Sequence, residues 1–143
     1  MVGKYMIRKI FIFTFFTLLL LFSCNDKIIF VICSQCVADE PKTADIKLNL
    51  EPETGSFINV NVYRGLIEDS VLVDSFTTDS AEYTYIGEVN TKYTFTAEYL
   101  TRSGNTIIAV NTAWPRVKYE KQQCQNPCYY TYDKTVNLRI KYQ

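Results

Sequence analysis

The feature that most constrains the fold of this chain is an alternation of apolar and polar residues with a period of two. Successive side chains of a β-strand point to opposite faces, so this alternation predicts strands with one buried and one wet face. No window of ten or more residues has the pattern of an amphipathic helix. The clearest predicted strands are 46–51, 58–62, 92–100 and 136–142, and the shorter ones are 71–76, 82–86, 106–111 and 116–121.

Residues typical of tight turns separate these segments. Gly, Pro, Asn, Asp and Ser favour turns because they supply unusual backbone angles or local hydrogen bonds. Seven to eight strands joined by such turns predict an all-β fold, an antiparallel Greek-key β-sandwich of immunoglobulin-like or transthyretin-like type. The turns are Glu53–Ser56, Arg64–Gly65, Thr78–Ser80, Ser103–Asn105 and Asn126–Pro127.

The first 23 residues have the organisation of an export signal. Lys4, Arg8 and Lys9 precede the apolar run Ile10–Phe22. As a helix this run would span only about 20 Å of a bilayer core of roughly 30 Å. The segment Leu21-Phe22-Ser23-Cys24 looks like a lipobox, which predicts cleavage before Cys24 and acylation of that cysteine. The alternatives are an ordinary signal peptide, or an uncleaved anchor extended by the apolar residues 28–32.

We therefore predict three regions in the chain. Residues 1–23 form a lipoprotein signal peptide, residues 24–42 the lipidated N-terminus with the first cysteine pair, and residues 43–143 the β-sandwich domain. Without the signal, the chain keeps 15 − 3 = 12 basic and 15 acidic residues, a net charge of 12 − 15 = −3. A mildly acidic chain without a stripe of basic residues argues against nucleic-acid binding.

Once Cys24 is assigned to lipid, Cys33, Cys36, Cys124 and Cys128 remain. An even number of cysteines in an exported chain predicts disulfides, and three connectivities are possible. We expect bonds between the two clusters, Cys33 with Cys128 and Cys36 with Cys124. Loops of about ninety residues would contribute roughly 4 to 5 kcal/mol. The alternatives are a four-thiolate zinc site and a redox pair formed by Cys33 and Cys36.

The residue inventory argues against catalysis. The chain has no histidine, the commonest general base and the commonest nitrogen ligand of metals. Clustered carboxylates at Asp39–Glu40, Glu51/Glu53 and Glu68–Asp69 are typical of solvated turns rather than of an acid–base pair or a calcium site. We predict a non-enzymatic protein with neither a cofactor nor a metal site.

Aromatic residues are concentrated late in the chain. Such rings in exposed loops stack on sugar faces, so they are candidates for a surface site that binds glycans or other ligands. The competing interpretation is that these residues serve the core and the strand edges of the sandwich. The group contains Trp114, Tyr119, Tyr129, Tyr130 and Tyr132, of which all except Tyr119 are the candidate ligand-binding residues.

Two segments carry a resemblance to known families. The stretch from Val60–Gly65 to the Tyr-x-Phe-x-Ala-x-Tyr strand Tyr93–Tyr99 resembles the Greek-key sandwiches of the transthyretin-like, carboxypeptidase-regulatory-like and fibronectin type III groups. With Cys24, the two cysteine pairs and Thr106–Val110, the whole chain is similar to small lipoproteins of the Bacteroidetes. The resemblance implies a fold and an outer-membrane location, on the periplasmic face or the cell surface, and it implies no chemistry.

Two functions from different classes are consistent with these features. The first is an envelope structural or protein-interaction module, held on the membrane by its lipid. The second is a surface module that binds a glycan or another ligand through the late aromatic residues. The partners expected are the membrane and either an envelope protein or a glycan.

Overall fold

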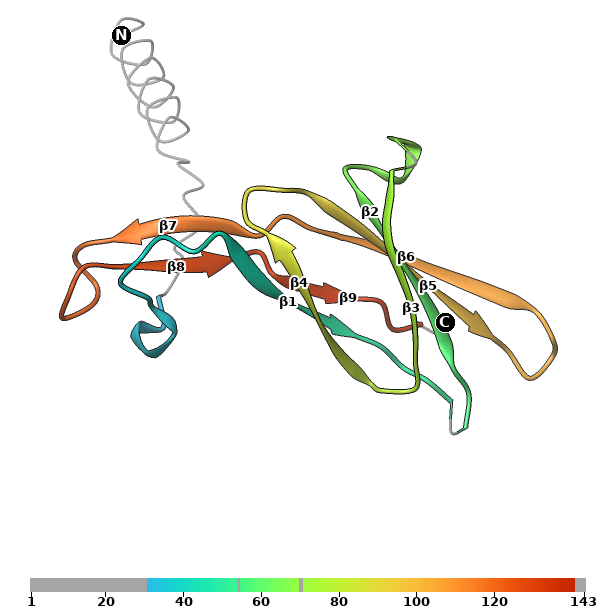
Figure 1. Ribbon diagram of the computed structural model, residues 1–143. Coiled ribbons are helices and arrows are strands. Elements are labelled where there is room, and N and C mark those ends of the chain that lie inside the picture. Colours follow the sequence, from blue (N-terminus) through green and yellow to red (C-terminus); the bar gives the residue numbers. More distant parts are fainter. Residues whose placement is uncertain (1–30, 54, 70, 141–143) are drawn as a thin grey trace, which may run out of the picture. The chain divides into compact units, whose positions relative to one another are not determined.

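The computed structural model describes residues 31–53, 55–69 and 71–140, and these residues form nine strands and two short 3-10 helices. Figure 1 shows the course of the chain. The predicted signal peptide and Cys24 lie outside the described residues. The elements in chain order are η1 (Cys33–Gln35), β1 (Thr43–Asn49), β2 (Ile58–Arg64), η2 (Ile67–Asp69), β3 (Leu72–Thr78), β4 (Glu82–Glu88), β5 (Tyr93–Leu100), β6 (Thr106–Ala113), β7 (Arg116–Glu120), β8 (Cys128–Tyr132) and β9 (Thr135–Asn137).

Seven of the strands form a two-sheet sandwich, as predicted. One sheet has the order β4-β1-β9 and the other the order β3-β2-β5-β6. Pairing within both sheets is antiparallel with one exception, since β9 runs parallel to β1 with Lys47 beside Thr135. The prediction of an all-β sandwich is confirmed, and the parallel pair is a departure from the purely antiparallel pairing expected.

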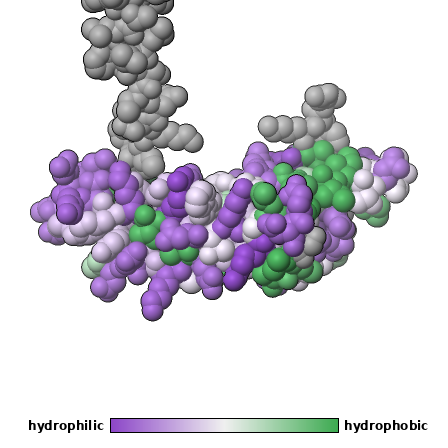
Figure 2. Space-filling model, turned by 90° about the horizontal axis from the view of Figure 1, so that it is seen from above, coloured by the Kyte–Doolittle hydropathy of each residue, from purple (hydrophilic) through white to green (hydrophobic). Residues whose placement is uncertain are grey.

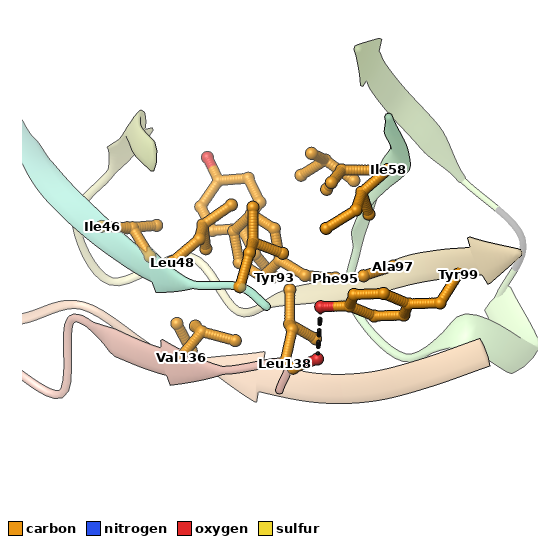
Figure 3. Close-up of a cluster of buried hydrophobic side chains, with 13 residues drawn as sticks. Ile46, Leu48, Ile58, Tyr93, Phe95, Ala97, Tyr99, Val136 and Leu138 are labelled. Carbon is orange, nitrogen blue, oxygen red and sulfur yellow. Dashed lines mark hydrogen bonds between the residues drawn. The ribbon is translucent and has the colours of Figure 1, made fainter. Parts of the chain in front are cut away.

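The core lies between the two sheets, and its members come from alternate positions of the strands (Figure 3). In β1 the residues Ile46 and Leu48 are buried, while Asp45 and Lys47 are exposed. Phe95 of β5 is fully buried, and two rings pack near it, Tyr85 edge-on at 5.6 Å and Tyr93 at 6.3 Å between centroids. The predicted burial of one strand face is seen clearly in β1 and β2, whereas β5 is buried on both faces, including Thr94 and Thr96.

A buried hydroxyl group links the two sheets at one end of the core. Tyr99 of β5 donates a hydrogen bond of 2.8 Å to the carbonyl oxygen of Leu138, which follows β9 (Figure 3). The backbone N–H of Glu51 donates to the same hydroxyl at 3.3 Å. Burial raises the pKa of Tyr99 above its ordinary value, because the charged phenolate would lose its hydration. The hydroxyl thus stays protonated and serves as donor and acceptor at once.

The strands β7 and β8 form a separate two-stranded hairpin between β6 and β9. The sequence predicts the first of them and does not identify Cys128–Tyr132 as a strand. The last predicted strand, 136–142, differs from the structure, where β9 spans Thr135–Asn137 and residues 138–140 are not in a strand; residues 141 and 142 lie outside the described residues. Leu138 nevertheless stays buried and its N–H donates to the carbonyl oxygen of Asn49 at 2.8 Å.

Apolar residues are also exposed on the surface of the sandwich. On the face shown in Figure 2, hydrophobic residues gather over the strands of the four-stranded sheet, and hydrophilic residues prevail over the hairpin. The exposed apolar side chains of that sheet and its loops include Leu66, Val71, Leu72, Val73, Leu100, Ile107, Ile108 and Val110.

Candidate functional site

Four cysteines fasten the N-terminal segment to the β7–β8 hairpin, and we call this group the cysteine clasp. Disulfides join Cys33 to Cys124 and Cys36 to Cys128, with Cα–Cα distances of 5.6 and 5.5 Å. One residue further on, Val37 exchanges two backbone hydrogen bonds of 2.9 and 2.8 Å with Tyr129 of β8. The clasp is therefore a covalent link supported by a short stretch of β pairing.

The expected long-range disulfides are present, but their partners are exchanged. The predicted pairing of Cys33 with Cys128 and of Cys36 with Cys124 is wrong. The antiparallel bridge between Val37 and Tyr129 holds the segment that carries Cys36 against the start of β8, where Cys128 lies. The turn of η1 then brings Cys33 to the loop after β7, where Cys124 lies.

The sulfur atoms of the clasp lie close together. Cys36 Sγ is 4.0 Å from Cys124 Sγ, and the sulfurs of Cys36, Cys124 and Cys128 all lie within 4.8 Å of one another. Zinc binding and nucleophilic attack both require thiolates, and a disulfide sulfur is not one. Cys33 and Cys36, whose spacing matches a redox pair, are bonded to other cysteines and not to each other. In this oxidised form the clasp is a structural cross-link.

The loop that carries Cys124 is held by the carboxylate of Glu120, the last residue of β7. Glu120 Oε1 accepts hydrogen bonds from the backbone N–H groups of Gln122 at 2.7 Å and Gln123 at 3.1 Å. Both bonds favour the charged carboxylate and so lower the pKa of Glu120, the bond from Gln122 more than the bond from Gln123. The side chain of Gln123 in turn accepts a bond from the N–H of Val31 at 3.2 Å.

We expect acid to loosen this loop. A carboxyl group whose pKa is lower in the folded state stabilises that state fully above its unfolded pKa. The stabilisation is lost as the pH falls through the lower, folded pKa. Amide hydrogen exchange at Gln122 and Gln123, corrected for intrinsic rates, should therefore accelerate in acid in the native protein. In Glu120→Gln the acceptor oxygen remains but does not titrate, so the corrected exchange should be independent of pH. Equal pH dependence in both proteins would contradict this role.

The late aromatic residues do not form a single surface. Residues that pair directly across the hairpin point to the same face, and successive residues along one strand point to opposite faces. Tyr130 and Tyr132 lie on one face with ring centroids 5.9 Å apart, whereas Tyr129 lies on the other, 4.8 Å from the ring of Tyr119. The candidate residue Tyr129 therefore lies on the opposite face of the hairpin from the candidate residues Tyr130 and Tyr132.

The guanidinium group of Arg116 lies at the centre of the larger aromatic group. The guanidinium carbon of Arg116 lies 4.9 Å from the ring centroids of both Trp114 and Tyr132. Asp133 accepts a 2.6 Å bond from Arg116, and this bond raises the pKa of the guanidinium. We call Trp114, Arg116, Tyr130 and Tyr132 the Arg116 cluster. Arg116 thus stacks on the rings of Trp114 and Tyr132, which were predicted to stack on a ligand. The spacing of these residues in the sequence does not indicate this arrangement.

Only part of the Arg116 cluster is open to solvent. The Trp114 side chain is 48% exposed, while Tyr130 is buried at 6%. Two buried polar atoms, Arg116 Nε and Tyr130 Oη, have no hydrogen-bond partner among the described residues. Trp114 is therefore the candidate residue that a ligand could reach first.

The clustered carboxylates predicted to be solvated are exposed at Asp39–Glu40, Glu51, Glu53 and Glu68–Asp69. Asp69 accepts a hydrogen bond of 3.0 Å from the N–H of Leu66, and Glu53 forms an exposed ion pair of 3.1 Å with Arg102.

Within the described part of the chain, no helix is long and apolar enough to cross a membrane. The anchor predicted at Cys24 lies outside that part. Comparison with protein-family models, with curated proteins and with solved structures finds no match to this chain.

Proposed function

We propose that this protein is a lipid-anchored envelope module without catalytic activity, which serves a structural or protein-interaction role on the outer membrane. The observation that carries the proposal is the cysteine clasp. It begins 33 − 24 = 9 residues after the predicted lipidation site Cys24 and ends on the hairpin. A lipid at Cys24 would thus be joined to the folded domain through a short segment and two disulfides.

The clasp is suited to a protein held at a membrane. Disulfides persist in oxidising compartments outside the cytoplasm, which supports export. They close loops of 91 and 92 residues between Cys33 and Cys124 and between Cys36 and Cys128. Force applied at the N-terminus would reach the hairpin through covalent bonds and would not unzip the first segment of the domain.

Lipidation is tested by metabolic labelling of the full chain with an alkyne analogue of palmitate in a bacterial host. We expect the native protein to carry the label and to fractionate with membranes. Cys24→Ser should lose the label completely, because the acylated thiol is absent. The double variant Cys33→Ala/Cys124→Ala is the matched control and should keep it. Label that persists in Cys24→Ser would refute the anchor.

A second candidate function is ligand binding at the Arg116 cluster. It is favoured by the exposed ring of Trp114, which lies beside the guanidinium of Arg116. A carbohydrate offers an apolar face that can stack on such a ring. Glycan-array binding that Trp114→Ala abolishes would favour this function over the structural one. Tyr130→Ala is less informative because Tyr130 is buried.

A further inference from the structure

Among the edges of the two sandwich sheets, β6 lacks the features that protect an edge strand. Proteins commonly block such edges with charged residues or with very short strands. β3 carries Asp74, β4 carries Glu82 and Glu88, and β9 is only three residues long. β6 has eight residues, and the chain has no charged residue between Arg102 and Arg116.

The register of β5 shows which backbone groups of β6 face outward. The N–H of Gly65 donates to the carbonyl oxygen of Lys92, which makes the pairs Tyr63/Thr94 and Asn61/Thr96 the hydrogen-bonded ones between β2 and β5. The odd-numbered residues of β5 must then bond to β6. In β6 their partners are Ile107, Ala109, Asn111 and Ala113.

The N–H and C=O groups of Ile108 and Val110 therefore point away from β5. No described residue pairs with them. β9 approaches β6 near its C-terminal end, where Asn111 Nδ2 donates to the carbonyl oxygen of Asn137 at 3.0 Å. The N–H of Thr112 is bonded locally to Asn111 Oδ1 at 2.8 Å. The open part of the edge is thus centred on Ala109.

The side chains of the open edge are suited to pairing with themselves. Ile108 is 55% and Val110 53% exposed on the outer face of the sheet, with exposed Thr106 and Thr112 on either side. A twofold axis at Ala109 would place Ile108 opposite the partner subunit's Val110. It would place Thr106 opposite the partner subunit's Thr112. Apolar residues would meet apolar residues, hydroxyls would meet hydroxyls, and no like charges would be opposed.

We propose that β6 is a dimerisation edge, which pairs in antiparallel orientation with β6 of a second copy of this chain. The two four-stranded sheets then form one continuous sheet of 4 + 4 = 8 strands. The backbone groups of Ile108 and Val110 exchange hydrogen bonds with those of the partner. This pairing uses only residues of the sandwich, so it does not depend on the lipid anchor.

The oligomeric state of the full chain tests the proposal, measured by sedimentation equilibrium in density-matched detergent. We expect a dimer for the native protein. Val110→Pro removes one outward N–H and leaves the bonds to β5 intact, so it should weaken the dimer roughly tenfold or more. Val110→Thr is the matched control, because it keeps the N–H and the β-branched shape, and it should remain dimeric.

A second pair of variants covers the case in which Val110→Pro fails to fold. Val110→Lys keeps the N–H but places two like charges across the interface, and it should yield monomers. Ile86→Lys adds the same charge at a side chain 67% exposed on the other sheet, and it should stay dimeric. A native monomer would overturn the proposal. A dimer that survives Val110→Lys, or an edge filled only by a strand of another protein, would overturn it as well.

Discussion

Removal of all four clasp cysteines is expected to lower the free energy of unfolding by about 7 kcal/mol. The first cross-link between the two clusters closes a loop of 91 or 92 residues, and it contributes about 4.6 kcal/mol by the loop-entropy relation. With that link in place, the second closes only the short segments between the cysteines of each cluster. Such a loop of roughly nine residues contributes about 2.6 kcal/mol.

The two disulfides should therefore be strongly non-additive. Cys33→Ala/Cys124→Ala and Cys36→Ala/Cys128→Ala are each expected to cost only about 2 to 3 kcal/mol, because the remaining bond holds the same two segments together. Urea unfolding of both double variants measures these costs, and thermal unfolding shows whether the fourfold variant is still folded. If the variant without all four cysteines lost no more unfolding free energy than one double variant, this account would be contradicted. Peptide mapping of the native protein under non-reducing conditions checks the pairing directly.

Substitution of Phe95 by alanine is expected to cost about 3 to 5 kcal/mol of unfolding free energy. Phe95 is fully buried between the sheets and packs against Tyr85 and Tyr93, so truncation leaves a cavity that these rings cannot fill without moving. Phe57→Ala is the matched control, since Phe57 is 66% exposed, and it should change stability by less than about 0.5 kcal/mol. Similar losses for the two variants in urea unfolding would mean that Phe95 is not part of a tightly packed core.

The sandwich strands could be predicted from the sequence because burial of one strand face imposes a readable period. The strand predicted over 92–100 is β5, Tyr93–Leu100, and its core positions are the expected ones, Tyr93, Phe95, Ala97 and Tyr99. The expectation that its other face is wet is wrong for Thr94 and Thr96, which are buried. The prediction missed β8, Cys128–Tyr132. Both faces of this strand carry aromatic residues, so no alternation is visible there.

Pairing across long distances was less accessible from the sequence. The spacing of the cysteines indicates two clusters but not the turn of η1, and that turn decides which partner Cys33 meets. Alternation of residues is the same in either chain direction, so it could not show that β9 runs parallel to β1. The stacking of Arg116 on Trp114 and Tyr132 likewise depends on the register of the hairpin.

The parallel pair of β1 and β9 also affects when the chain can fold. Lys47 pairs with Thr135, a separation of 135 − 47 = 88 residues. The edge of β1 that pairs with β9 therefore has no partner strand until nearly the whole described chain is free to fold. Contacts of such high sequence separation slow folding, because a long loop must close first. For a chain exported as proposed above, the sandwich would close only after translocation is almost complete. The polypeptide would then stay unfolded, and able to thread through a translocation channel, for most of its passage.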